Sequence, residues 1–364
     1  MIKSILLFII VIFSSFQSSP QQIDSIVLVD ERLPVTPKEF YIAKVIDQRT
    51  DKNPVALLFP TKNVKGVQPK TYPVDLQGGA LPAIKQFISN NVPRNTKLRP
   101  LIISLKKISV RETILAGNMI EGRINVMFSF ALDMGEDEMQ YLGDYNGNAV
   151  YNRNAGQNRD IEPTLRHVFL NGLLYINTWV NQQAETNIKL ARSVKVTFTD
   201  YSEKPEGDSI YYTVKRPLAW ADFQSKIPNS KYEAEVFPTL GYDEHVEIIK
   251  GIINLRIAVK ACLPKSASWA KEGSKNDYTL NHEQRHFDIV KIAAEHFKQK
   301  IKARSLSTNN YDGPINEEYL DAYREMNSLQ KQYDDETHHG TNTTEQQKWN
   351  EKIDKELIEL GISH

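Results

Sequence analysis

Within a block that favours a helix, the chain reads Leu280-Asn281-His282-Glu283-Gln284-Arg285-His286-Phe287-Asp288. Its centre is an H-E-x-x-H motif, in which two histidines stand four residues apart and a glutamate follows the first. Because residues four apart lie on one face of a helix, His282 and His286 can bind one metal ion together. Neither proline nor glycine interrupts residues 277–304, so we expect one continuous helix there.

This motif predicts a defined chemistry. A protein-bound Zn²⁺ lowers the pKa of water to about 7, and a neighbouring carboxylate accepts the proton as the water attacks a carbonyl group. We therefore expect His282 and His286 to bind Zn²⁺ and Glu283 to act as the general base. The alternative interpretation is a solvated helix on which the two histidines align by chance, and the polar residues Gln284 and Arg285 between them are compatible with it.

A catalytic zinc ion usually has three protein ligands and one open position, so a third ligand is needed. At about 100° per residue, Asp288, Glu295 and His296 do not share the helix face of the two motif histidines. We expect the third ligand in residues 333–340, which read Tyr-Asp-Asp-Glu-Thr-His-His-Gly and concentrate ligand-type side chains between two expected helices. The alternative is a polar loop between helices.

The first 22 residues are typical of a secretory signal peptide. Lys3 supplies a positive charge, and residues 5–16 form a continuous apolar run that polar and small residues follow. That run is shorter than the roughly 20 residues that a membrane-spanning helix needs. We expect cleavage of residues 1–22, export, and no transmembrane span in the mature chain.

The composition fits a folded soluble protein. The chain has 364 residues with 45 Lys+Arg and 45 Asp+Glu, and 40% of its residues are hydrophobic. These values argue against disorder and against a polytopic membrane protein. The neutral balance lacks the basic footprint of a nucleic-acid binder. Cys262 is the single cysteine, so an intramolecular disulfide is excluded.

Length and local sequence predict two domains. Residues 200–208 are polar and contain Pro205 and Gly207, which is typical of a linker. We expect an N-terminal α+β domain over residues 23–205 and a C-terminal domain over residues 206–364. The elements expected in the first are strands 40–46, 101–110, 124–132 and 193–199, and helices 81–88 and 163–182. Those expected in the second are strands 210–214 and 246–263, and helices 277–304, 316–333 and 344–360.

Three motifs resemble those of a known family. Residues 282–289 resemble its H-E-Q-x-H-F-D-I block, residues 216–224 its R-x-L-x-W-x-D-F block, and residues 333–340 its Y-D-x-E-T-x-H-G block. The family comprises secreted bacterial proteins, catalogued as a domain of unknown function and regarded as zinc-dependent peptidases. The resemblance covers about residues 209–360 and leaves the N-terminal half outside.

The resemblance implies a zincin-like C-terminal domain with a small antiparallel sheet, a helical metal site and a periplasmic or secreted location. Carried over residue by residue, it makes His282 and His286 metal ligands and Glu283 the general base. Its H-G pair falls on His339 and Gly340, so His339 is the implied third ligand, with Glu336 as the runner-up.

Together these features favour an exported zinc-dependent metallopeptidase that acts on a peptide or protein substrate. Two alternatives stay open: a non-catalytic envelope protein whose metal site stabilises it, and a zinc hydrolase of a non-peptide amide. Residues 252–263 could form an edge strand that holds an extended substrate, or equally a core strand. Tyr333 is a candidate hydrogen-bond donor to a transition-state oxyanion, although helix packing is its favoured role.

Overall fold

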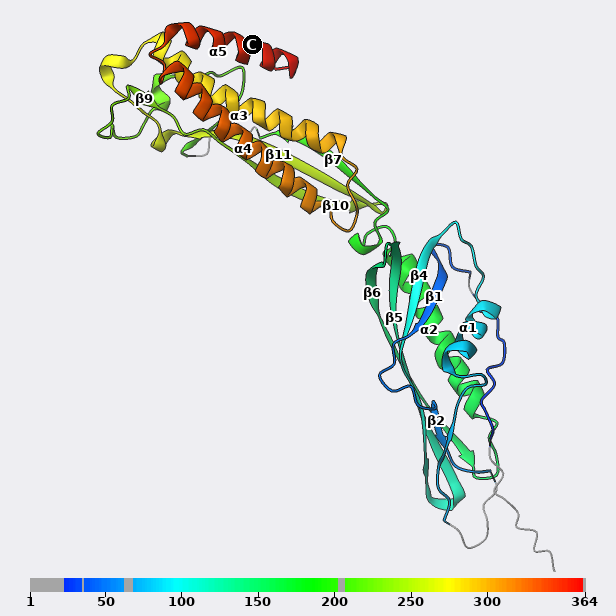
Figure 1. The fold of residues 1–364 in the computed structure, drawn as a ribbon. Coiled ribbons are helices and arrows are strands. Elements are labelled where there is room, and N and C mark those ends of the chain that lie inside the picture. Colours follow the sequence, from blue (N-terminus) through cyan, green and yellow to red (C-terminus); the bar gives the residue numbers. More distant parts are fainter. Residues whose placement is uncertain (1–22, 35, 62–67, 202–206, 363–364) are drawn as a thin grey trace, which may run out of the picture. The chain divides into compact units, whose positions relative to one another are not determined.

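The computed structural model describes residues 23–34, 36–61, 68–201 and 207–362 (Figure 1). The expected signal peptide lies outside the described residues. The chain divides into two units between Gln182 and Gln183. Within the described ranges, none of the helices is long and apolar enough to cross a membrane. Both units combine helices with sheets, which confirms the mixed α and β composition expected from the sequence.

The first unit is a six-stranded sheet with two helices, α1 (Ala80–Asn91) and α2 (Ile161–Gln183), on one face. Phe169 of α2 contacts both Phe87 of α1 and Phe128 of the sheet, which places the helices side by side. In sheet order the strands are β3 (Tyr72–Val74), β2 (Ala56–Leu58), β4 (Arg99–Ile114), β5 (Met119–Gly135) and β6 (Glu138–Asn154), with β1 (Phe40–Asp47) paired to β4.

A buried ion pair lies inside this first unit. The side chains of Arg153 on β6 and Glu112 on β4 are 0% exposed, and Arg153 Nε lies 2.6 Å from Glu112 Oε1. Tyr151 Oη donates to the same oxygen at 2.7 Å, and the backbone N–H of Phe59 donates to Glu112 Oε2 at 2.7 Å. Both oxygens of the Glu112 carboxylate accept hydrogen bonds, and the carboxylate lies against the guanidinium of Arg153. Neither buried charge is therefore left unpaired.

The second unit is built on a four-stranded sheet whose central strand is β11 (Ile252–Pro264). This strand pairs antiparallel with β10 (Thr239–Ile249) and β8 (Ser209–Tyr211), and parallel with β7 (Ser193–Asp200). The expected antiparallel sheet is found for β8, β10 and β11, but β7 departs from it because it runs parallel to β11. Because β7 pairs with β11, it belongs to the second unit. The domain boundary expected at residue 205 therefore lies inside that unit.

Residues 246–263 form two strands instead of the single run that the sequence predicted. Lys250 and Gly251 have φ of 52° and 71°, and this left-handed pair turns β10 back into β11. Since β11 is paired on both sides, its interpretation as an edge strand is wrong and its interpretation as a core strand is confirmed. A separate two-stranded ribbon joins β9 (Ala234–Glu235) to β12 (Trp269–Ala270).

Three helices complete the second unit: α3 (Asp277–Ala303), α4 (Asp312–Thr337) and α5 (Thr343–Glu359) (Figure 1). Phe287, Val290 and Phe297 of α3 are buried in the core that includes β11, whereas Ile289 and Ile292 pack with residues of α4 and α5. Burying an apolar side chain of this size contributes about 1.5–3 kcal/mol. Helix α3 is thus fixed from two sides, and the H-E-x-x-H motif lies near its N-terminal end.

Candidate metal centre

The motif residues lie on a buried part of α3. The helix begins after Asn276, whose side chain caps it by accepting a hydrogen bond from the N–H of Thr279. His282, Glu283 and His286 follow within the next three turns and are 5%, 3% and 8% exposed. The alternative of a solvated helix is therefore wrong for this face of α3.

Each motif histidine is tethered through Nδ1 to a glutamine side chain. His282 Nδ1 lies 2.8 Å from Oε1 of Gln346 on α5, and His286 Nδ1 hydrogen-bonds to Oε1 of Gln330 on α4. Each glutamine NH₂ group donates elsewhere: Gln346 Nε2 donates to Tyr333 Oη at 2.7 Å and Gln330 Nε2 to the carbonyl of His286 at 3.0 Å. Both imidazoles are therefore held with Nδ1–H as donor and Nε2 as a free ligand atom.

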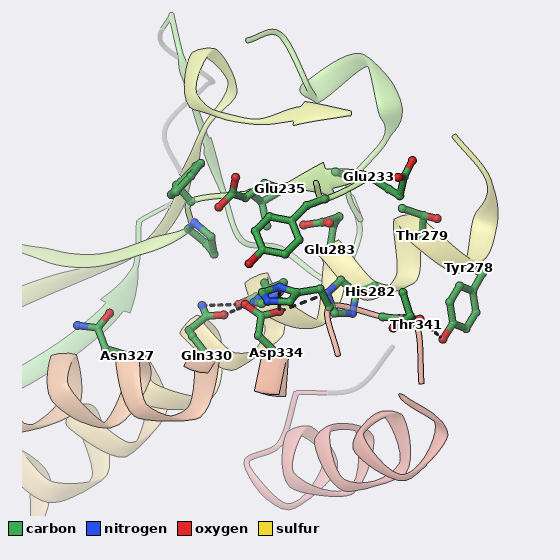
Figure 2. A pocket seen from close by; sticks show the side chains of 18 residues that line it. Glu233, Glu235, Tyr278, Thr279, His282, Glu283, Asn327, Gln330, Asp334 and Thr341 are labelled. Atoms are coloured by element: carbon green, nitrogen blue, oxygen red, sulfur yellow. Dashed lines mark hydrogen bonds and ion pairs between the residues drawn. The ribbon is translucent and has the colours of Figure 1, made fainter. Parts of the chain in front are cut away.

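The two Nε2 atoms converge on the carboxylate of Asp334 on α4, whose side chain Figure 2 shows beside that of His282. Asp334 Oδ1 lies 3.5 Å from His282 Nε2 and 3.1 Å from His286 Nε2. The ligand atoms of these three residues all lie within 4.8 Å of one another, so they could hold one metal ion. Asp334 Oδ1 is buried without a hydrogen-bond partner, and a cation at this point would satisfy it.

The charge state of Asp334 also suits a metal ligand. Burial opposes its ionisation, but in the absence of an ion, contacts from protonated His282 and His286 and the charge of His339 outweigh burial and hold the pKa of this carboxyl well below its usual range. Asp334 is therefore an anion at neutral pH. Two imidazoles and one carboxylate form a donor set that first-row metals such as zinc and iron accept in proteins.

His339, the third ligand implied by the resemblance, lies beside this group. Its Nδ1 is 3.3 Å from Asp334 Oδ1, and its ring packs on Tyr232 with 4.0 Å between ring centres. It is not among the three residues whose ligand atoms gather within 4.8 Å, so its role as a ligand stays a prediction. Glu336 faces elsewhere: its carboxylate accepts hydrogen bonds from Trp349 Nε1 and Gln332 Nε2 at 2.7 and 2.8 Å.

Helix α4 runs four residues past its expected end at residue 333, and this extension explains which side chain reaches the site. On the added turn Asp334 faces α3, while Glu336, about 200° further round, faces α5. Tyr333 is fully buried, and its hydroxyl lies 2.9 Å from His282 Nδ1, behind the ring and away from the cavity. It orients His282, which agrees with the packing role favoured from the sequence.

The loop after α4 holds the chain in an unusual backbone conformation. His338, His339 and Gly340 have φ of 52°, 54° and 78°, all in the left-handed region. A Cβ at Gly340 would lie 3.1 Å from Cγ of His282, so only glycine fits against that ring without displacing it. Tyr278 Oη fixes the loop further by donating to the carbonyl of Gly340 at 2.6 Å.

Gly340→Ala is expected to weaken metal binding by about 10–100-fold, because the added methyl pushes His282 away from Asp334. The measurement is the zinc dissociation constant by competition with a chromogenic chelator. Gly361→Ala is the matched control: its φ is 76°, yet a Cβ there has no atom within 4 Å. Equal zinc affinities for the two variants would contradict the prediction.

Glu283 lines a cavity of about 430 Å³ together with the two histidines and Asp334 (Figure 2). Burial raises the pKa of Glu283 to about 7, Asp334 and Glu235 add to the rise, and His282 and the N–H of Val236 oppose it. In this site Glu283 can therefore accept and release a proton near neutral pH, which is the property required of a general base.

Residues 216–224, which resemble the R-x-L-x-W-x-D-F block, contact α3 on the face opposite the cavity. Arg216 forms two hydrogen bonds with Asp222, and the N–H of Leu218 donates to Gln284 Oε1 at 2.8 Å. Arg285 lies 3.0 Å from Asp288, whose side chain is fully buried. The polar residues inside the motif are thus part of a buried network, and Asp288 lies off the metal site, as the helix geometry predicted.

Comparison with known proteins gives a family match over part of the second unit and a structural similarity that is low. Residues 263–340 match the family model described as "Bacterial protein of unknown function (DUF922)". The match lies within the second unit and includes residues 282–289 and 333–340, two of the three motifs noted in the sequence. No curated protein matches the chain.

Among solved structures, the chain is similar to the crystal structure of protein XCC0632 from Xanthomonas campestris, of family DUF330. The similarity has 9% identity and a TM-score of 0.28, and it covers 44% of this chain and 98% of that one. A TM-score this low supports no inference about function.

Proposed function

We propose that the second unit is a zinc-dependent metallopeptidase, in which His282, His286 and Asp334 hold the ion and Glu283 is the general base. The observation that carries this proposal is the convergence of two Nδ1-tethered imidazoles on a carboxylate oxygen that has no hydrogen-bond partner, beside a buried glutamate. Two histidines and one carboxylate form the ligand class of several catalytic zinc sites.

Zinc bound by these residues would act as a Lewis acid, which would polarise a carbonyl group and lower the pKa of water. The protein residues supply the proton transfers. Glu283 accepts the proton of the attacking water and delivers it to the leaving amine. Gln330 and Gln346 hold the two imidazoles in one tautomer and one orientation, so the ligand atoms are arranged before substrate binds.

The wall of the cavity favours an extended polypeptide as the substrate. Residues 232–238, which include β9, line it along one side. Within the described chain β9 pairs only with β12, so its other edge is available for the backbone of an extended segment. The strand expected to have this role, residues 252–263, lies in the middle of its sheet, and β9 takes its place in the proposal.

The test is metal analysis combined with a peptide-library cleavage assay on the full mature chain. We expect one zinc per chain, cleavage of peptides, loss of cleavage after chelation, and recovery when zinc is added. Bound iron, or a zinc site with no hydrolysis of any peptide, would overturn the proposal. The second result would favour the stabilising metal site or the non-peptide amide considered from the sequence.

Asp334→Ala is expected to weaken zinc binding by at least about 100-fold, because it removes a charged ligand. His339→Ala is the comparison, since His339 lies beside the same oxygen but outside the group of three. We expect it to weaken binding less than tenfold. Isothermal titration of both variants measures the difference, and a larger loss in His339→Ala would restore His339 as the third ligand.

A further inference from the structure

The cavity beside the metal centre has a one-sided charge. Four carboxylates line it, those of Glu233, Glu235, Glu283 and Asp334, whereas none of its described lining residues is lysine or arginine. Asp334 is accounted for by the proposed ion, and Glu283 by the proposed proton transfer. The charges of Glu233 and Glu235 are not yet explained, and both residues belong to the segment 232–238 that lines one side of the cavity (Figure 2).

These two glutamates differ in whether a neighbouring cation balances their negative charge. Glu233 pairs with Lys271 at 3.3 Å and accepts a hydrogen bond from Ser274. Glu235 accepts a hydrogen bond from Trp269 Nε1 at 3.2 Å, and it makes no ion pair with a lysine or arginine of the described chain. Glu235 is therefore the carboxylate whose charge is available to a ligand.

An exposed aromatic ring lines the same cavity as Glu235. Glu235 belongs to β9 and Phe237 follows it two residues later, while Ala234 and Val236 are buried. Phe237 also lines the cavity and is 49% exposed, which is unusual for a phenylalanine in this unit. A carboxylate beside an exposed ring fits a lysine or arginine side chain, because the ring contacts the alkyl stem and the carboxylate binds the charge.

We propose that this cleft selects polypeptides that carry a lysine or arginine close to the cleaved bond, with Glu235 as the residue that determines the preference. The inference rests on the proposed peptidase function, since it names the substrate class of that site. Glu233 has a minor part, because Lys271 already compensates its charge.

The probe is a pair of alanine-rich decapeptides that are identical except at two central positions, which carry lysine in one and norleucine in the other. Norleucine keeps the alkyl stem without the ammonium group. We expect kcat/KM for the lysine peptide to exceed that for the norleucine peptide about fivefold at low salt, the factor that corresponds to a partly exposed ion pair. The ratio falls as ionic strength rises.

Glu235→Gln is expected to bring this ratio to about 1, and the glutamine oxygen can still accept the hydrogen bond of Trp269 Nε1. Glu233→Gln, the matched control in the same segment, should keep most of the preference. Peptide binding to the Glu283→Gln protein, measured by fluorescence anisotropy, gives a readout that does not depend on turnover. The same ratio of dissociation constants is expected there.

The outcomes separate the two proposals. Cleavage of both peptides at equal rates, or a preference that survives in Glu235→Gln, overturns the selectivity and leaves the peptidase proposal intact. Binding that favours lysine through Glu235 without any cleavage supports the selectivity of the cleft and overturns the peptidase. Failure to bind or cleave either peptide overturns both.

Discussion

Glu283→Gln is expected to lower kcat for peptide hydrolysis by at least about 100-fold while leaving zinc bound, because an amide cannot accept the proton of the attacking water. The substitution is nearly isosteric, which matters at a position that is only 3% exposed. Glu283 lies outside the three residues whose ligand atoms gather around the proposed ion, so its replacement removes no ligand. The loss should therefore fall on kcat and leave the zinc dissociation constant within about threefold of wild type.

The measurement combines kcat from a fluorogenic peptide with zinc content by mass spectrometry on the same protein sample. Glu272→Gln is the control for a change of charge alone, because the side chain of Glu272 is 87% exposed and lies outside the residues that line the cavity. Turnover that persists in Glu283→Gln would exclude Glu283 as the base. Loss of zinc in this variant would assign Glu283 to metal binding instead.

The sequence was sufficient to predict the local part of this site. His282, Glu283 and His286 come together through the geometry of one helix, and α3 ends within one residue of its expected end because no proline or glycine breaks it earlier. Asp334 was missed because its position depends on how α4 packs against α3 and on where α4 ends. The resemblance favoured His339 in the same block, and its role as a ligand stays a prediction. One additional helical turn brings Asp334 to the imidazoles as a further candidate ligand.

The fold shows the same limit. The alternating apolar residues of β5 predicted a half-buried strand, and Ile124, Val126 and Phe128 are buried as expected. Its neighbour β6 was missed, because its run of asparagine, glycine and charged residues carries little local strand signal and is ordered by pairing with β5. Strand β7 was assigned to the wrong unit, because nothing in its local sequence indicates that it pairs with β11, more than fifty residues further along the chain.

The buried ion pair of the first unit leads to the second large effect. Glu112→Gln is expected to lower the free energy of unfolding of that unit by about 3–5 kcal/mol, because Arg153 keeps its charge in a place from which water is excluded. The guanidinium would retain its hydrogen bonds to the carbonyls of Phe59 and Gln157, at 2.7 Å each, but no anion would balance it. Hydrogen exchange with mass spectrometry can follow β4 and β6 separately from the second unit.

A surface pair in the same sheet provides the control for this prediction. Arg123 and Glu121 form an ion pair at 2.7 Å with side chains 75% and 23% exposed, so Glu121→Gln should change stability by less than about 1 kcal/mol. The double variant Glu112→Leu with Arg153→Met removes both charges and should recover much of the loss, since an apolar pair leaves no unpaired charge. Equal stabilities for Glu112→Gln and Glu121→Gln would show that water reaches Arg153, and that the charge is not held in a dry core. Zinc affinity should be unchanged in all of these variants, because the proposed ligands belong to the second unit.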